Sequence, residues 1–417
     1  MIITIEALNY RCLRYIKQTM GSFQVLVGPN ASGKTTFLDV VTFLGRFVSV
    51  GVETAVGERT HNFQDLLWQR RGQSFELSIE SKIPENILAK LPKGEYDRIR
   101  YEVAIGLSST TNEISILAEK VLLKSDSVNL PEISQGLLFP LPTEIPHSIM
   151  TFKGTKNTRL IVNKEPGGND NYYDETGGSW NPSFRLGPRK SALNNLPYDE
   201  SKFPTATWFK DYLQEGIQQF ILNSLLIRKA SPPDQIRGFK TDGSNLPWII
   251  STLHDYSPQQ FSCWITHLQT ALPDLDTICV VEQEDDRHRY LVLCYKNGLN
   301  VPSWMASDGT LRLLALTLPA YLTDFHGVYL IEEPENGIHP RAVETMFQSL
   351  LSVYDAQILV ATHSPVILSL VKSEDVLCFS KTTNGATNVI RGSEHPALKE
   401  WRGETTLGNL FAGGVLD

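Results

Sequence analysis

The first part of the chain combines two periodicities, and together they predict a strand, a loop and a helix. Residues 3–7 alternate between apolar and polar side chains, which is typical of a strand with one buried face. The apolar run 23–27 ends at Gly28, and after Thr35 apolar residues recur at helical spacing. A short strand is therefore expected to lead through a loop directly into a helix.

Further alternation predicts strands on both sides of an irregular middle. The patterns at 75–80 and 101–105 indicate edge or antiparallel strands, and strands return at 277–282 and 290–295. The stretch 126–205 is rich in Pro, Gly, Asn and Ser, a composition that predicts turn-rich loops.

Two segments of the second half show helical periodicity. One helix is expected to carry apolar residues from Trp208 to Leu225 and to end before Pro232-Pro233. A second helical pattern follows residues 242–246 and continues past Pro258.

Size and charge limit the class of protein. At 417 residues the chain exceeds what one hydrophobic core usually organises, so two domains or lobes are expected. A hydrophobic content of 41% with 20% charged residues is ordinary for a soluble globular protein. The net charge of −8 argues against a generally basic nucleic-acid coat, although it is compatible with a local basic patch.

Cysteine usage and hydropathy predict a cytoplasmic location. The five cysteines form no CxxC pair and have no regular spacing, so they are expected to be reduced, mostly buried thiols. The N-terminus lacks the basic region of a signal peptide, and no run of about 18 apolar residues occurs. No membrane association is therefore expected.

The loop 28–35 carries the most specific chemistry. Its sequence Gly-Pro-Asn-Ala-Ser-Gly-Lys-Thr fits the phosphate-binding pattern G-x-x-x-x-G-K-[ST] in full. Glycines let backbone N–H groups close around phosphates, and the following helix adds a favourable dipole. Lys34 is expected to reach the β- and γ-phosphates of ATP, and the Thr35 hydroxyl to hold Mg²⁺. The residues expected to contact ATP here are Asn30, Ala31, Ser32, Gly33, Lys34, Thr35 and Thr36.

A second candidate is the apolar strand 327–331, which ends in Glu332 and Glu333. By itself this pattern also fits any buried strand with a polar end. Beside a phosphate loop, one carboxylate can face the metal and the next the attacking water, because side chains alternate along a strand. Glu332 is then expected to support Mg²⁺ and Glu333 to polarise the nucleophilic water.

Two further motifs complete the set. The strand that begins near residue 357 ends in His363, which is predicted to hydrogen-bond the γ-phosphate and to sense its presence. The turn Ser307-Asp308-Gly309 opens a helical run and presents backbone amides to an anion. A lone histidine is more often structural, and Ser-Asp-Gly is a common helix cap, so both readings depend on the other motifs.

The order of these motifs resembles the ATPase head of ABC-type proteins, and more closely the RecF-like, SMC-like and OLD-family branch with AAA_21-type ATPases. The run 332–340 is similar to the Walker B and D-loop of that branch, and residues 9–11, 242–246 and 361–365 also resemble it. The signature turn departs from the Leu-Ser-Gly-Gly-Gln of transporters, which counts against membrane transport.

The resemblance implies an α/β fold, namely an ABC-type head with a mixed β-sheet and phosphate loop, interrupted by an inserted α+β or helical domain. The head would comprise 1–90 and 241–417, and 91–240 would be the insertion. It also implies a head-to-tail dimer, in which Ser307 and Gly309 of one subunit cap the γ-phosphate held by the other. Arg11 would contact nucleotide, and Gln64 and Gln69 are candidates for the glutamine of the lid loop.

Three uses of ATP hydrolysis follow as hypotheses. Because OLD-family proteins carry a Toprim nuclease and the stretch after His363 has no such constellation, the first is a sensor or regulatory subunit of a bacterial antiphage defence system. Its effector, a nuclease or toxin, would be a separate protein. The alternatives are a RecF- or SMC-like DNA-binding ATPase in repair, and a slow ATP-gated scaffold.

Nucleic acid contacts would fall on basic and aromatic residues of the middle region, but the basic residues are scattered among acidic ones, which favours a solvated surface. The basic candidates are Lys153, Lys156, Arg159, Arg185, Arg189, Lys190, Arg228, Lys229, Arg237 and Lys240, and the aromatic ones are Tyr172, Tyr173 and Trp180.

Overall fold

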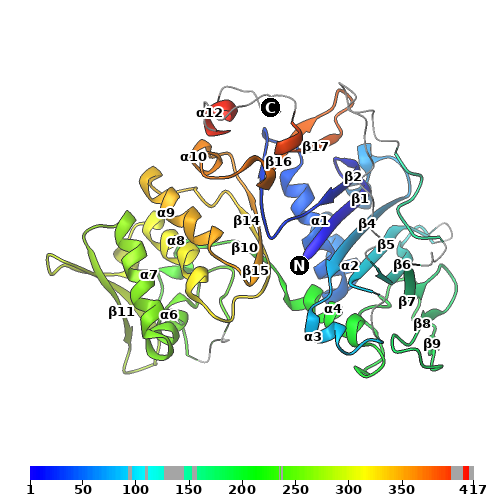
Figure 1. Cartoon of the computed structure of the whole chain (residues 1–417), viewed down its shortest axis with the longest axis horizontal. Coiled ribbons are helices and arrows are strands. Elements are labelled where there is room, and N and C mark those ends of the chain that lie inside the picture. The colour runs from blue at the N-terminus through cyan, green and yellow to red at the C-terminus, as the bar shows by residue number, and fades with distance from the viewer. Residues whose placement is uncertain are drawn as a thin grey trace. The chain divides into compact units, whose positions relative to one another are not determined.

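The protein folds into two compact units and has three sheets in a computed structural model of the chain, counted over the residues that the structure describes (Figure 1). The structure describes residues 1–92, 96–108, 111–125, 145–152, 157–233, 235, 238–395 and 407–412. Unit 1 contains 1–21, 30–217 and 379–389, and unit 2 contains 22–29, 218–378 and 390–417. The chain therefore passes between the units inside the phosphate loop.

Unit 1 is built on an eight-stranded antiparallel sheet, in the order β2-β1-β4-β5-β6-β7-β8-β9. The strands are β1 (Ile2–Tyr10), β2 (Leu13–Thr19), β4 (Ser74–Lys82), β5 (Arg98–Leu107), β6 (Ile114–Lys124), β7 (Thr158–Lys164), β8 (Asp170–Tyr172) and β9 (Ser183–Phe184). The predicted strands at 3–7, 75–80 and 101–105 are confirmed within β1, β4 and β5. The sheet combines strands from both sides of residue 90, the position at which the predicted head gives way to the predicted insertion. That domain boundary stays a prediction.

One long helix packs its apolar face against the sheet of unit 1. Helix α1 (Lys34–Val50) buries apolar residues on successive turns, as its helical spacing predicts. The Phe43 ring packs edge-on against Tyr10 of β1 and Phe75 of β4. Burial of such aromatic residues fixes the helix against the sheet. Shorter helices of this unit are α2 (Val52–Gly57), α3 (Glu85–Leu88) and α4 (Pro204–Glu215), with 3-10 turns η1 (Phe63–Leu66) and η2 (Trp68–Arg70).

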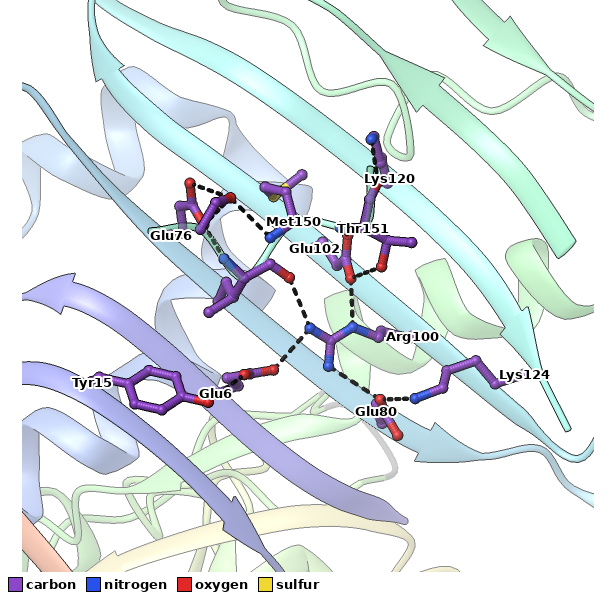
Figure 2. Close-up of polar contacts among 12 residues, drawn as sticks. Glu6, Tyr15, Glu76, Glu80, Arg100, Glu102, Lys120, Lys124, Met150 and Thr151 are labelled. Atoms are coloured by element: carbon purple, nitrogen blue, oxygen red, sulfur yellow. Dashed lines mark hydrogen bonds and ion pairs between the residues drawn. The ribbon is translucent and has the colours of Figure 1, made fainter. Parts of the chain in front are cut away.

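A buried charge cluster crosses four strands of this sheet, with Arg100 of β5 at its centre (Figure 2). The Arg100 guanidinium contacts the carboxylates of Glu6 at 2.8 Å, Glu80 at 3.1 Å and Glu102 at 2.5 Å. All four side chains are less than a tenth exposed. Burial by itself lowers the pKa of Arg100, but the three carboxylates around the guanidinium outweigh this effect and raise the pKa, so Arg100 stays charged. Lys124 adds a second cation beside Glu80.

The same cluster holds a short segment of chain, 148–151, against the sheet (Figure 2). Glu76 accepts hydrogen bonds from the Ser148 hydroxyl at 2.9 Å and the Ile149 N–H at 2.6 Å. Glu102 accepts from the Thr151 N–H at 2.7 Å, and Arg100 donates to the Ile149 carbonyl at 3.1 Å. Charged side chains therefore supply hydrogen-bond partners for the backbone groups of this segment, which is not part of a strand.

A six-stranded sheet, most of which belongs to unit 2, has the order β10-β14-β15-β3-β16-β17. Its strands are β3 (Phe23–Val27), β10 (Ile217–Phe220), β14 (Gly327–Glu332), β15 (Ala356–Ala361), β16 (Val376–Lys381) and β17 (Thr387–Arg391). Strands β14, β15, β3 and β16 run parallel. Their near-continuous apolar runs fit a sheet that is buried on both faces.

Helices and a small sheet complete unit 2. The helices are α5 (Ser224–Ile227), α6 (Leu246–Tyr256), α7 (Pro258–Ala271), α8 (Asp308–Thr317), α9 (Pro340–Leu351), α10 (Pro365–Leu368) and α12 (Leu407–Ala412). The 3-10 turns are η3 (Ser303–Met305), η4 (Leu318–Tyr321), η5 (Ser373–Asp375) and η6 (Gly392–Glu394). The three-stranded antiparallel sheet has β11 (Leu275–Glu282), β12 (Arg289–Tyr295) and β13 (Asn300–Pro302), so the strands predicted at 277–282 and 290–295 are confirmed.

The helix predicted from Trp208 to Leu225 is wrong in its second half. Helix α4 ends at Glu215, and the chain then forms β10 beside β14. Gly216 follows the helix, and a Cβ at this position would collide with the Tyr212 carbonyl. Apolar residues at 217 and 220 fit a helical stripe equally well, so spacing alone did not reveal the strand.

Within the described residues, no helix combines the length and apolar character needed to cross a membrane.

Removal of the Arg100 charge is expected to destabilise unit 1 strongly. Arg100→Ala leaves three buried carboxylates without their shared cation, and breaking such a group costs about 3–5 kcal/mol of unfolding free energy. Arg98→Ala is the matched control on the same strand, because Arg98 pairs with Asp97 at 3.6 Å where both side chains are about one-third exposed. That variant should lose at most about 1 kcal/mol. Urea unfolding measures both, and equal losses would contradict the role of the cluster.

Candidate functional site

The phosphate loop joins β3 to α1 through three backbone conformations of positive φ. They occur at Gly28 (φ 147°), Ala31 (φ 60°) and Gly33 (φ 109°). The two glycines adopt these angles without steric cost, whereas Ala31 is held in a left-handed conformation that few residues other than glycine adopt. Successive turns of this kind direct backbone N–H groups into a concave anion site. Lys34 is the first residue of α1, so it stands at the positive end of the helix.

The last part of the phosphate loop, at Ser32 and Gly33, is tightly packed within unit 1. A Cβ at Gly33 would collide with the Thr387 side chain, whose hydroxyl donates to the Ser32 carbonyl at 2.8 Å. The Ser32 hydroxyl oxygen is itself buried and has no hydrogen-bond partner. An orphaned polar atom inside a loop of this shape fits a phosphate ligand.

Arg11 lies beside the first turns of α1. Its guanidinium is 3.4 Å from the Asp39 carboxylate and remains 30% exposed. Asp39 also accepts from the Tyr10 hydroxyl at 2.5 Å and from Arg59 at 2.8 Å. Burial, and then the Asp39 charge, raise the pKa of Tyr10 well above its usual value, so the phenol stays a donor. Two guanidinium groups share the Asp39 carboxylate, and that of Arg59 also lies 3.8 Å from the Glu58 carboxylate.

Three parallel strands of unit 2 end at one edge of the six-stranded sheet. Glu332 of β14 pairs in register with Ala361 of β15, and Ala361 pairs with Leu26 of β3. The Glu333 N–H donates to the Ala361 carbonyl at 2.7 Å, and the Thr362 N–H donates to the Leu26 carbonyl at 3.1 Å. The start of the phosphate loop, the paired carboxylates and His363 therefore all leave the sheet at this edge, as the sequence motifs predict. Ligands of open parallel sheets bind at such carboxyl ends.

Glu332 has a partner that sequence reasoning missed. The Gln219 side-chain amide donates to the Glu332 carboxylate at 3.1 Å, and Gln219 lies on β10 beside β14. Of the two expected candidates for a lid-loop glutamine, Gln69 instead donates to the Asn384 carbonyl at 3.4 Å in unit 1. Gln64 follows the cap of a 3-10 turn. Recognising β10 as a strand beside β14 would have pointed to Gln219, but the apolar residues around it also fit a helix, which is what the sequence predicted.

Glu333 adopts a left-handed backbone conformation with φ 47°. Its carboxylate accepts a hydrogen bond from the Asn336 side chain, two residues beyond Pro334. Non-glycine residues in this region cost free energy and persist where the surroundings impose them, often at functional sites. The turn thus sets the direction of the carboxylate at the strand end.

Glu335 connects this turn to the histidine strand. One oxygen of its carboxylate accepts from the Thr362 hydroxyl at 2.5 Å and from the His363 N–H at 3.2 Å. The other oxygen is buried without a hydrogen-bond partner. The Glu333 turn and His363 are therefore tied through one side chain that sequence reasoning did not select.

The signature turn lies at the start of α8. The Ser307 hydroxyl accepts from the Thr310 N–H at 3.1 Å, so Ser307 is the helix cap that its sequence also predicted. Gly309 packs so closely on the Gly337 carbonyl that no Cβ fits. Arg228 contacts Asp308 at 2.5 Å. Two large apolar side chains directly before this turn are exposed, those of Trp304 and Met305 in η3.

The candidate nucleic-acid residues are mostly engaged where the structure describes them. Arg159 donates to the Asp174 carbonyl, and Arg189 pairs with Glu53 and Glu113. Tyr172 is fully buried. Lys153, Lys156 and Arg237 lie outside the described residues.

The donor set at the sheet edge suits Mg²⁺ bound through a nucleotide. Across the part of the chain that is described, no group of three or more His, Cys, Asp or Glu side chains is positioned to hold a metal ion by itself. Mg²⁺ typically takes one or two protein ligands and completes its shell with phosphates and water. The Glu332 carboxylate at this edge is a ligand of that kind, and the Thr35 hydroxyl of α1 stays a predicted ligand.

Comparison with known proteins defines the class. Among solved structures, the fold resembles the head domain of SMC proteins, an ABC-type ATPase fold. One is the SMC head bound to the C-terminal winged-helix domain of ScpA, with a TM-score of 0.52 and 12% identity over 93% of this chain and 97% of that one. Another is the SMC head with an extended coiled coil bound to the C-terminal domain of ScpA, from Pyrococcus furiosus, with a TM-score of 0.50 and 11% identity over 93% and 95%.

The family follows from the sequence profile. Residues 23–110 and 179–369 match the family AAA_21, described as "AAA domain, putative AbiEii toxin, Type IV TA system". The match covers more than half of the chain, which therefore belongs to this family of ATPase domains. No curated protein matches the sequence.

Glu335→Ala is expected to slow ATP turnover without weakening nucleotide binding. The substitution releases the His363 backbone from the Glu333 turn and leaves the phosphate loop unchanged. Loss of such a supporting contact typically costs roughly 10- to 100-fold in activity. Glu335→Gln keeps an acceptor oxygen and should recover most of kcat, and Glu344→Ala at an exposed position of α9 is the control. If Glu335→Ala raised the Kd for ATP by as large a factor as it lowered kcat, this role of Glu335 would be contradicted.

Proposed function

We propose that this protein binds ATP with Mg²⁺ and hydrolyses it to ADP and phosphate. The observation that carries the proposal is the common sheet edge at which β3, β14 and β15 end. That edge brings the entry to the phosphate loop together with Glu332, Glu333 and the strand that leads to His363. Family membership supports the same activity.

Each residue takes a role that its position favours. Lys34 and the loop amides bind the β- and γ-phosphates, and Thr35 with Glu332 holds Mg²⁺, which offsets phosphate charge as in other phosphoryl transfers. Gln219, through its hydrogen bond to Glu332, keeps that carboxylate oriented. Glu333 orients and polarises the attacking water, and His363 hydrogen-bonds the γ-phosphate. Arg11 contacts the nucleotide beside α1.

A head-to-tail dimer completes the proposed cycle, with Ser307 and Gly309 of one subunit capping the γ-phosphate of the other. The exposed side chains of Trp304 and Met305, next to the signature turn, support it, because a dimer interface there would cover this apolar surface. Met305 is 70% exposed and Trp304 is 50% exposed. ATP at the interface would then couple turnover to association.

For the biological role, we propose the sensor or regulatory subunit of an antiphage defence system that acts through a separate nuclease or toxin. The family description, which names a toxin of a toxin–antitoxin system, favours defence over DNA repair. A phage challenge of cells carrying the gene with its neighbours tests this role. Protection that is lost with Lys34→Ala is expected, and protection that survives the substitution would overturn the role while leaving the ATPase intact.

Lys34→Ala and Glu333→Gln are expected to fail at different steps. Lys34→Ala removes the charge at the loop and should abolish ATP binding, whereas Glu333→Gln should bind ATP with normal affinity and lose about 10²-fold or more in turnover. Lys17→Ala on β2 is a matched control outside the loop. Fluorescent nucleotide titration and phosphate release measure the two steps. Normal turnover by Glu333→Gln would remove Glu333 from the mechanism.

The slow variant also tests the dimer. With ATP, Glu333→Gln should accumulate as a dimer in light scattering, while Lys34→Ala stays monomeric. A double variant of Glu333→Gln with Ser307→Arg should bind ATP as a monomer, because a bulky charge then blocks the cap. Ser352→Arg, after α9, is the surface control in the same background. Dimerisation that tolerates Ser307→Arg would contradict the proposed interface.

A further inference from the structure

Two cysteines of unit 2 lie close together on neighbouring strands. Cys279 is on β11 and Cys294 on β12, and their sulfur atoms are 3.3 Å apart. The expectation that the thiols are mostly buried is wrong, since Cys279 and Cys263 are exposed, Cys12 and Cys294 are half-buried and Cys378 alone is buried. The sequence could not show the pair, because fourteen residues separate the two cysteines and only the strand register brings them together.

The register explains how the sulfurs meet. Cys279 pairs with Val292 and Cys294 with Thr277, so the two cysteines are diagonal neighbours rather than direct partners. An irregularity between Leu275 and Thr277 shifts the register at this end of the hairpin. Diagonal positions are farther apart than the usual separation of disulfide-bonded residues, so a bond here would carry strain. Strained and exposed disulfides are the easily reduced ones.

The two thiols differ in reactivity. Cys279 is exposed to solvent and is the thiol that an oxidant reaches first. Burial, and then the neighbouring Cys279 thiol, raise the pKa of Cys294 to about 11. Cys294 therefore stays protonated at neutral pH and reacts second, after the first sulfur has become electrophilic.

We propose that Cys279 and Cys294 form a reversible intrachain disulfide, with hydrogen peroxide as the oxidant. The Cys279 thiolate attacks one peroxide oxygen, the O–O bond breaks, and sulfenic acid and hydroxide form. The Cys294 sulfur then attacks the sulfenic sulfur, its proton goes to the leaving hydroxyl group, and water departs as the S–S bond forms. Overall, two thiols and one peroxide give one disulfide and two waters. A dithiol reductant reverses the bond by thiol–disulfide exchange.

The position of the pair gives the bond a structural consequence. Strand β12 pairs with β13, and β13 leads through η3 to the signature turn at Ser307. On β12 itself, Tyr290 packs on Trp304 of η3 with ring centroids 4.9 Å apart. A covalent link between β11 and β12 would fix the hairpin that supports this turn. The inference concerns the thiols themselves and does not depend on ATP hydrolysis.

The experiment counts thiols in the full-length protein after brief peroxide treatment. Excess peroxide is removed, the protein is unfolded with an alkylating reagent, and intact mass and peptide mapping locate the unmodified cysteines. Wild type should lose two alkylatable thiols, both on the 279 and 294 peptides, and dithiothreitol should restore both. Cys263→Ser removes an exposed cysteine of α7 and should behave as wild type at the pair.

Single variants of the pair make the outcome decisive. Cys279→Ser should leave Cys294 alkylatable after peroxide, and Cys294→Ser should leave Cys279 as a sulfenic or further oxidised species without a disulfide. Faster closure at pH 8.5 than at pH 7 is expected, because the Cys294 thiol must lose its proton. The proposal would be overturned if Cys279 and Cys294 both stayed alkylatable in treated wild type. A bond between Cys279 and a cysteine other than Cys294, or a link between two chains, would overturn it as well.

Discussion

The parallel register of β3, β15 and β14 is the constraint on which the proposed chemistry depends. Backbone pairing aligns Glu332 with Ala361 and Ala361 with Leu26. A slip of one residue would turn Glu332 to the opposite face of the sheet, because side chains alternate along a strand. The buried apolar residues that hold these strands in register therefore also determine the position of the carboxylates at the sheet edge. Motifs separated by some three hundred residues in sequence then meet at one edge through ordinary hydrogen bonds.

Unit 1 depends on a different interaction, the buried cluster around Arg100. Its antiparallel strands place four carboxylates on the sheet, and the guanidinium, Lys124 and the backbone of 148–151 satisfy them. Such a cluster is costly to desolvate and more costly to break. It gives the sheet a specific pairing and fixes a segment that has no strand partner of its own. Neither role was visible from spacing, since Glu6, Glu80, Arg100 and Glu102 looked like the solvated faces of half-buried strands.

Functional residues could be predicted from the sequence only where they belong to a motif of neighbouring residues. The phosphate loop and its neighbouring strand and helix were predictable because G-x-x-x-x-G-K-[ST] constrains backbone and chemistry together. Glu332 and Glu333 were predictable because an apolar strand ends in them. Gln219 and Glu335 were not, because each acts through a hydrogen bond to a residue distant in sequence. The cysteine pair likewise exists only through the register of β11 and β12.

The most direct test of the central claim is single-turnover phosphate release, measured with protein in excess over ATP so that dimers can form. We expect release in the presence of Mg²⁺ and none after chelation with EDTA, with ATP binding retained by Glu333→Gln while its release step is lost. If wild type binds ATP and Mg²⁺ but releases no phosphate over many hours, the sheet edge formed by β3, β14 and β15 is not a hydrolytic site.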